Sequence, residues 1–236
     1  GESVVLDLAR MPHLIVSGAT GMGKSVCLSS LLISLLYRYS PDEMRLIIID
    51  PKIVEFNMYK GIPHLVFNDI IGIDNRAMAV LEWAVEEMER RYQLLADNFC
   101  KDIGEYNESI DKTKEKKMPF IVILIDEFAD LIMADDKNRK KIETYIGRLA
   151  QKARASGISL ILATQRPSAN IISGSIKTNI PSRICFKTST STDSRVVIDE
   201  NGAEKLVCKG DCLYKTSDEG FLKRAQGSLI SNDEIK

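Results

Sequence analysis

The sequence predicts an α/β fold in which helices cover both faces of a mostly parallel central sheet, followed by a short β-rich C-terminal extension. Short apolar runs of strand length alternate with longer segments whose apolar residues recur at helical spacing. Such alternation is typical of parallel strands joined by crossover helices. The runs at 120–125 and 158–163 are apolar throughout, as in strands that are buried on both faces. After Pro167 the alternation ends, and only short strand-like segments follow.

The first half of the chain supplies the opening strands and two long helices. Leucines recur on one face of the first helix, and Asp74 is placed to cap the second, whose apolar positions keep the helical period. The expected elements are strands at 2–9, 14–17 and 45–50, and helices at 25–39 and from Asp74 to about Leu95.

The second half contains the two buried strands and the β-rich extension. Its polar, lysine-rich stretch at 101–118 predicts a loop with a turn or two of helix, and Gly157 is placed to end a helix. The expected elements are strands at 120–125 and 158–163, a helix at 138–156, and short strands at 182–187, 211–215 and 221–230.

The bulk composition is that of an ordinary globular domain. The 236 residues are 44% hydrophobic and 28% charged, so we expect one domain over residues 1–236, excised from a longer chain. A net charge of −1 argues against a protein that coats nucleic acid by bulk charge. The five cysteines match no disulfide or zinc spacing and indicate a reducing cytoplasm. The longest apolar stretch, 28–37, is shorter than the ~20 residues of a membrane span. Whether a longer parent chain is anchored in the bacterial inner membrane stays open.

A glycine-rich loop between the first strand and the first helix fits the motif G-x-x-x-x-G-K-[ST] at every fixed position. Its glycines let the backbone curl and point N–H groups inward, and the following helix adds its positive dipole end. Lys24 would contact the β- and γ-phosphates, and the Ser25 hydroxyl would ligate Mg²⁺. The motif therefore predicts a nucleoside triphosphate site made by Gly18, Ala19, Thr20, Gly21, Met22, Gly23, Lys24, Ser25 and Val26.

Two adjacent acids, Asp126 and Glu127, follow the apolar strand at 120–125. Next to a nucleotide, Asp126 would hold Mg²⁺ directly or through water, and Glu127 would orient and deprotonate the attacking water. A glutamate beside the metal-binding aspartate indicates a motor-type ATPase. The guanine-binding tetrapeptide N-K-x-D is missing, so we expect ATP as the nucleotide.

Gln165 and Arg166 leave the strand at 158–163, just after Thr164. If this strand lies between the strand of the phosphate loop and the strand of Asp126, Gln165 can sense the γ-phosphate. Arg166 either pairs with a carboxylate near the site or reaches a neighbouring molecule.

Segments along nearly the whole chain resemble, in the same order, those of the FtsK/SpoIIIE family of DNA translocases. The segments are 11–14 (MPHL), 50–52 (DPK) with Glu55 and Phe56, 61–65 (GIPHL), 87–92 (EMERRY), 149–155 (LAQKARA), 163–168 (ATQRPS), 179–184 (NIPSRI), 193–195 (DSR) and 202–206 (GAEKL). This set is far more specific than a phosphate loop alone. Met22 departs from the family's common serine, at a position that the loop motif leaves free.

The resemblance implies a RecA-like P-loop core, a hexameric ring with double-stranded DNA in its pore, and ATP at subunit interfaces. In such rings an arginine of the neighbouring subunit completes the site, and Arg183 is the first candidate for this arginine finger. Weaker candidates for pore or interface contacts are Lys152, Arg154, Lys177, Arg195 and Arg224. The family's membrane segment and carboxy-terminal winged helix are absent, so we expect this chain alone to assemble weakly and hydrolyse ATP slowly.

These features predict an ATP-dependent translocase of double-stranded DNA, acting in chromosome segregation or DNA transfer. Two related functions stay open: an FtsK-like ATPase of type VII protein secretion, and a coupling protein of a conjugative element. A nucleotide-binding module without turnover is a third alternative, against which the intact Lys24, Asp126 and Glu127 argue.

Overall fold

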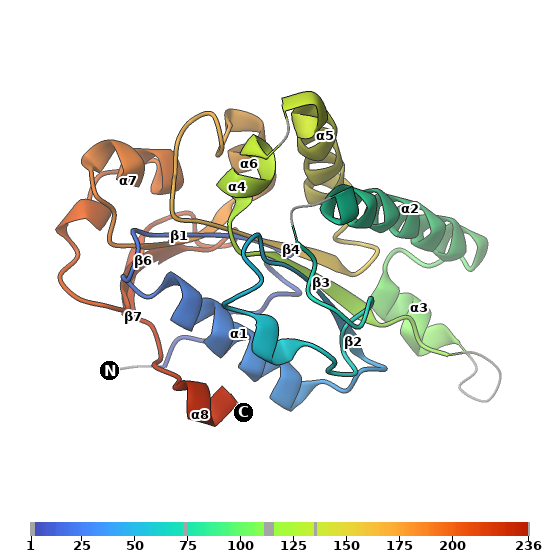
Figure 1. The fold of residues 1–236 in the computed structure, drawn as a ribbon. Coiled ribbons are helices and arrows are strands. Elements are labelled where there is room, and N and C mark those ends of the chain that lie inside the picture. The colour runs from blue at the N-terminus through green and yellow to red at the C-terminus, as the bar shows by residue number, and fades with distance from the viewer. Residues whose placement is uncertain (1–2, 73–74, 111–115, 135, 236) are drawn as a thin grey trace.

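The computed structural model describes residues 3–72, 75–110, 116–134 and 136–235. In these ranges seven strands form one sheet in the order β2-β3-β4-β1-β5-β6-β7 (Figure 1). Strands β1 to β5 run parallel to one another, and β6 and β7 continue the sheet antiparallel. The predicted fold class is therefore confirmed, and the C-terminal extension is part of the same sheet because β5 pairs directly with β1.

The elements alternate along the chain as the sequence predicts. The strands are β1 (His13–Ser17), β2 (Met44–Ile49), β3 (Phe120–Ile125), β4 (Ile158–Thr164), β5 (Ser182–Phe186), β6 (Asp211–Lys215) and β7 (Lys223–Gln226). The helices are α1 (Lys24–Arg38), α2 (Asn75–Asp97), α3 (Ile103–Ser109), α4 (Phe128–Met133), α5 (Asp136–Lys152), α6 (Gly174–Asn179), α7 (Ser191–Ile198) and α8 (Asn232–Ile235), with short 3₁₀ turns η1 (Asn57–Tyr59) and η2 (Ala203–Lys205).

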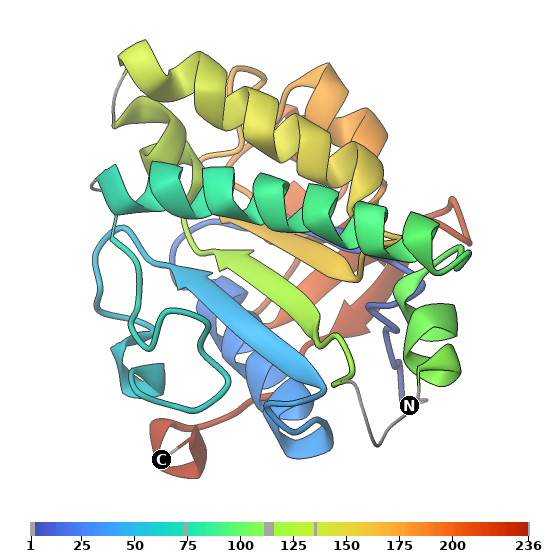
Figure 2. The ribbon, with the colours of Figure 1, turned by 90° about the vertical axis from the view of Figure 1, so that its right-hand side faces the viewer.

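Two hydrophobic layers sandwich the sheet. Figure 2 shows α2 and α5 on one side of the strands and α1 on the other. Because successive strand residues point to opposite faces, Ile123 of β3 packs in the layer that includes α2 and α5, whereas Leu124 packs with α1. The uniformly apolar strands thus have the burial on both faces that their sequences indicate.

Several predicted boundaries are wrong. Residues 3–9 form no strand; Leu6 and Leu8 instead pack at the edge of the α1 layer. Helix α5 ends at Lys152, four residues before the predicted end, and a turn that closes at the left-handed Gly157 (φ 72°) follows it. The predicted cap Asp74 lies outside the described residues.

Short helices, among them α4, α6 and α7, lie where the sequence predicts only strands, turns or loops. Helix α4 follows β3 directly, with Glu127 as its N-cap. Ser173 caps α6, and Thr190 opens α7 with a full capping box to Asp193. The capping residues were visible in the sequence, but helices this short carry little periodicity.

Arg91, in the family-like segment at 87–92, has a structural role. Its side chain is 2% exposed and donates to the carbonyls of Pro119 (2.8 Å) and Ser156 (2.9 Å). Glu87 balances its charge at 2.8 Å. Arg91 therefore ties α2 to the chain just before β3 and β4, at the edge of the sheet opposite to the phosphate loop.

His13, at the start of β1, is a buried imidazole that the fold keeps neutral. Its side chain is 2% exposed, its Nδ1 accepts the Leu160 N–H at 3.1 Å, and Nε2 has no partner among the described residues. Burial lowers the pKa of His13 to about 4, and the charge of Arg154 adds to this. In the unfolded chain, where a His pKa is ~6.5, His13 therefore takes up a proton at mildly acidic pH. In the folded chain it stays neutral at the same pH.

Above pH ~6.5 we expect protonation of His13 to have no effect on the free energy of unfolding. As the pH drops from ~6.5 to ~4, we expect this free energy to fall by up to about 3 kcal/mol. The chain has two histidines, so proton NMR of the His64→Gln variant isolates the His13 ring. Its resonance should titrate near pH 4. A titration near pH 6.5 in the folded protein would show that the ring is solvated.

Candidate functional site

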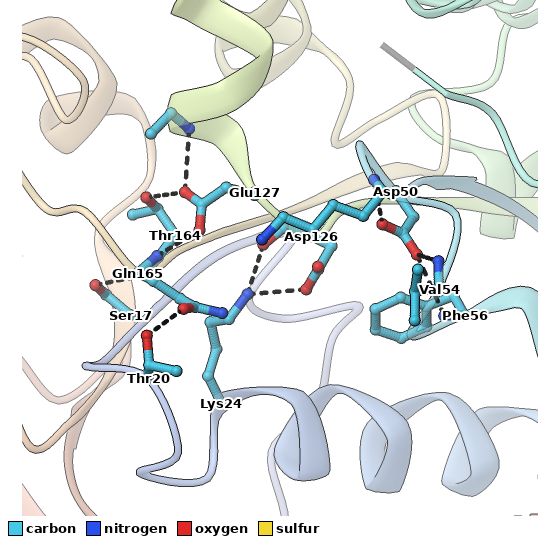
Figure 3. A network of polar contacts seen from close by, with 12 residues as sticks. Ser17, Thr20, Lys24, Asp50, Val54, Phe56, Asp126, Glu127, Thr164 and Gln165 are labelled. Atoms are coloured by element: carbon cyan, nitrogen blue, oxygen red, sulfur yellow. Dashed lines mark hydrogen bonds and ion pairs between the residues drawn. The ribbon is translucent and has the colours of Figure 1, made fainter.

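The phosphate loop and the polar ends of β3 and β4 meet at one edge of the sheet (Figure 3). Strand β4 lies between β1 and β3, so the three carboxyl ends are neighbours. This order meets the condition on which the sensor role of Gln165 depends. Ligands of open α/β sheets bind at this edge, outside the carboxyl ends of the strands.

The loop at 18–25 has the curled backbone that phosphate binding requires. Gly21 and Gly23 adopt left-handed conformations (φ 78° and 116°), which side chains other than glycine rarely adopt. At Gly18 a Cβ atom would lie 2.6 Å from Cβ of Phe186 on β5. Helix α1 begins at Lys24, so its free N–H groups face the loop. The geometry fits a phosphate chain.

Lys24 and Asp126 form a buried ion pair across the site. Lys24 Nζ donates to Asp126 Oδ1 at 2.8 Å and to its backbone carbonyl at 2.7 Å, and the two side chains are 3% and 8% exposed. Burial raises the pKa of Asp126, and the nearby carboxylates of Glu55 and Asp50 reinforce the shift, while Lys24 opposes it. The hydroxyl of Ser25 and the carboxylate of Asp126 are the hard oxygen donors that Mg²⁺ prefers.

Asp50, at the end of β2, shapes the loop beside Asp126. It is 1% exposed and accepts N–H groups of Lys52 (2.9 Å), Val54 (3.0 Å) and Phe56 (3.3 Å). Asp50 was predicted only as the end of a strand and as part of a family-like segment, with no role in the site. An aspartate that ends an apolar strand before proline was the available signal.

Glu127 is buried and held by three hydrogen bonds. Its carboxylate accepts the Thr164 hydroxyl, the Gln165 N–H at 2.8 Å and the Ala129 N–H at 3.3 Å. The last bond makes Glu127 the N-cap of α4. Two of the donors come from the last residue of β4 and the residue after it, so the strand next to β3 determines where this carboxylate points. Thr164 was not a predicted site residue, and only its position next to Gln165 hinted at a role.

Gln165 links the phosphate loop to Glu127. Its side-chain oxygen accepts the hydroxyl of Thr20 at 2.6 Å, while its own N–H holds the Glu127 carboxylate. One layer deeper, Ser17 donates to the carbonyl of Thr164 at 2.9 Å (Figure 3). A movement of the loop at Thr20 can thus be transmitted through Gln165 to the Glu127 carboxylate.

Arg183, the first candidate for an arginine finger, is hydrogen-bonded within its own chain. It is 4% exposed on β5, and its guanidinium donates to Lys177 O (2.9 Å), Val197 O (3.0 Å) and the carboxylate of Asp199. These acceptors lie in or beside α6 and α7 of the same chain. In this chain the guanidinium therefore ties β5 to α6 and α7, and a role in a neighbouring subunit's site stays a prediction.

The remaining basic candidates lie away from the phosphate loop or on the surface. Arg166 is 68% exposed and stands 3.8 Å from Asp130. Lys177 pairs with Asp199 at 2.6 Å, and Arg224 pairs with Asp211 at 2.7 Å. The other three basic candidates, Lys152, Arg154 and Arg195, are exposed. Across the described ranges, no helix is long and apolar enough to cross a membrane.

Residues 1–169 match the family model described as the FtsK/SpoIIIE family. The chain is 51% identical over 237 aligned residues to a protein named DNA translocase FtsK from Clostridium tetani. It is 48% identical to DNA translocase SftA from Bacillus subtilis. Both matches cover 100% of this chain but only 31% and 24% of those relatives, so the chain spans a third of their length or less.

Solved structures give the same architecture. The pCW3 conjugation coupling protein TcpA, in a monomer form with ATPγS, superposes with a TM-score of 0.83 and is 33% identical, covering 97% of this chain and 63% of that one. EssC ATPases 2 and 3 from Geobacillus thermodenitrificans superpose with a TM-score of 0.79 at 20% identity, over 96% of this chain and 42% of that one. At that identity the likeness to EssC shows the fold alone.

Proposed function

The chain belongs to the FtsK/SpoIIIE family, and from this premise we propose that it is an ATP-hydrolysing motor domain that moves double-stranded DNA. The observation that carries the proposal is the convergence of the phosphate loop, the Lys24–Asp126 pair and the oriented Glu127 at one sheet edge. ATP supplies the phosphoryl chemistry and Mg²⁺ the charge compensation when they are bound.

Each residue of the site then has a definite task. The loop amides and Lys24 bind the phosphates, and Ser25 and Asp126 hold Mg²⁺. Glu127, oriented by Thr164, accepts the proton of the attacking water, which is catalysis by positioning and general base. Gln165 bridges Thr20 and Glu127, so it is placed to report whether the γ-phosphate is present. No arginine finger is assigned to Arg183, because its donors are used within the chain.

Thr164 tests whether the orientation of Glu127 matters. Removing its hydroxyl in Thr164→Val keeps the side-chain shape but leaves Glu127 Oε1 with only the longer bond from the Ala129 N–H. We therefore expect kcat for ATP hydrolysis to fall about tenfold with ATP affinity unchanged. Thr164→Ser, which retains the hydroxyl, is the matched control and should keep most of the activity. Equal rates for the valine and serine variants would remove Thr164 from the mechanism.

Double-stranded DNA is the proposed cargo because the relatives that match the whole of this chain are named DNA translocases. We further propose a ring of six copies, in which each ATP site lies at a subunit interface. We also propose that this chain is one ATPase domain of a longer, membrane-anchored protein whose motor faces the cytoplasm. The relatives' greater length supports the last point. Grip on the phosphate backbone would be independent of sequence and sensitive to salt.

The test is ATP hydrolysis with and without duplex DNA at low salt, with Glu127→Gln as the blank. We expect duplex DNA to stimulate hydrolysis and added salt to abolish the stimulation. Turnover that duplex DNA leaves unchanged, in a form extended to the length of the relatives, would overturn the cargo. Stimulation by a secreted peptide instead would favour the protein-secretion alternative. The 33% identity to a conjugation coupling protein is consistent with a role in DNA transfer, which the proposal includes.

A further inference from the structure

The turn at residues 207–211, which leads into β6, touches the phosphate loop from the side opposite to Asp126 and Glu127. Gly210 N–H donates to the carbonyl of Met22 at 2.9 Å. A Cβ atom on Gly23 would lie 2.9 Å from Gly210 N and 3.1 Å from Gly210 Cα. The two backbones are therefore in direct contact at the last turn of the loop before Lys24. This turn lies beyond residue 169, where the match to the family model ends.

The turn is itself held rigidly by the neighbouring strand β7. Asp211 is 4% exposed, accepts the Val207 N–H at 2.9 Å and forms two hydrogen bonds with Arg224 at 2.9 and 2.7 Å. Gln226 donates to the carbonyl of Lys209 at 2.9 Å. On the other side, Gly227 N–H donates to Gly210 O at 2.7 Å. Gly210 has a left-handed backbone (φ 83°) within this frame.

We propose that the turn at 207–211 is a positioning element that holds the phosphate loop in its binding conformation, with Gly210 as the contact residue. The inference rests on the proposed function, since it concerns affinity for ATP at the same site. The turn contacts the loop at Met22 and Gly23, whereas the link to Glu127 leaves the loop at Thr20 and runs through Gln165. We therefore expect the turn to affect nucleotide binding more than the orientation of Glu127.

Gly210→Ala is the direct test. Its Cβ would lie 2.4 Å from Gln226 Nε2, so the Gln226 amide must leave its place beside the Lys209 carbonyl. The left-handed backbone at residue 210 would also be strained, and both effects loosen the turn that contacts Met22. We expect the Kd of a fluorescent ATP analogue to rise about tenfold, with kcat at saturating ATP within about threefold of wild type. A variant that merely loosened the fold would lose both together.

Gly220→Ala is the matched control. Gly220 lies in the connection between β6 and β7, has a left-handed backbone (φ 48°), and offers open space for a Cβ atom. It incurs similar backbone strain without touching the phosphate loop, so its Kd should stay within about twofold of wild type. A Gly210→Ala Kd equal to wild type, or an equal loss in Gly220→Ala, overturns the proposal.

Arg224→Gln provides a second variant in case Gly210→Ala fails to fold. Its side chain is 60% exposed, so the substitution removes a support of Asp211 and little packing. We expect about a threefold rise in Kd, and an unchanged Kd overturns the proposal. If the wild-type chain itself does not bind the ATP analogue, the proposed function fails first, and that outcome is distinguishable from a failure of the turn.

Discussion

Replacing Lys24 with methionine is expected to weaken ATP binding by at least about 100-fold and to remove hydrolysis. The ammonium is the strongest local charge that the loop offers to phosphate, and its 3% exposure means that no water replaces it. Binding is measured by titration with a fluorescent ATP analogue, and turnover by phosphate release. Lys141→Met, at an exposed position of α5, should change neither quantity.

The same substitution also has a consequence for folding. Without Lys24, Asp126 is a buried carboxylate that has lost its cation, so we expect the free energy of unfolding to drop by about 3 kcal/mol. The double variant Lys24→Met with Asp126→Asn should regain most of that stability and still not bind ATP. If the double variant recovers nucleotide affinity, the loss in the single variant came from disrupted folding, and the phosphate-binding role of Lys24 is wrong.

Glu127→Gln is expected to lower kcat by about 10²- to 10⁴-fold while ATP affinity stays within about threefold. Glutamine has the same shape and can still bond to Thr164 and Gln165, but it cannot accept the proton of a water molecule. Single-turnover hydrolysis and analogue binding separate the two effects. Glu108→Gln, at an exposed position of α3, serves as the control.

Turnover by Glu127→Gln at the wild-type rate would show that another group activates the water. In that case the three hydrogen bonds of Glu127 would serve only to cap α4 and to hold β3 against β4. Retained hydrolysis together with a weakened Kd would point instead to a binding role.

Sequence alone determined the features that depend on neighbouring residues. The phosphate loop at 18–25 is a continuous segment, and its glycines dictate the backbone whatever packs around it. Uniformly apolar strands such as 120–125 identify a sheet covered on both faces, and the acids that follow β3 must lie at its carboxyl edge. The family resemblance rested on the same local segments, and the match over residues 1–169 confirmed it.

Only the tertiary structure decided how distant segments combine. The place of β4 between β1 and β3 brings Thr164 and Gln165 to Glu127, and strand order does not follow from strand sequence. Arg183 looked available as a finger, but α6 and α7 supply acceptors that use its guanidinium. Whether a polar side chain is free or already bonded depends on chain crossings many residues away. For the same reason the contact of Gly210 with the phosphate loop, 188 residues after Met22 in the sequence, is visible only in the folded molecule.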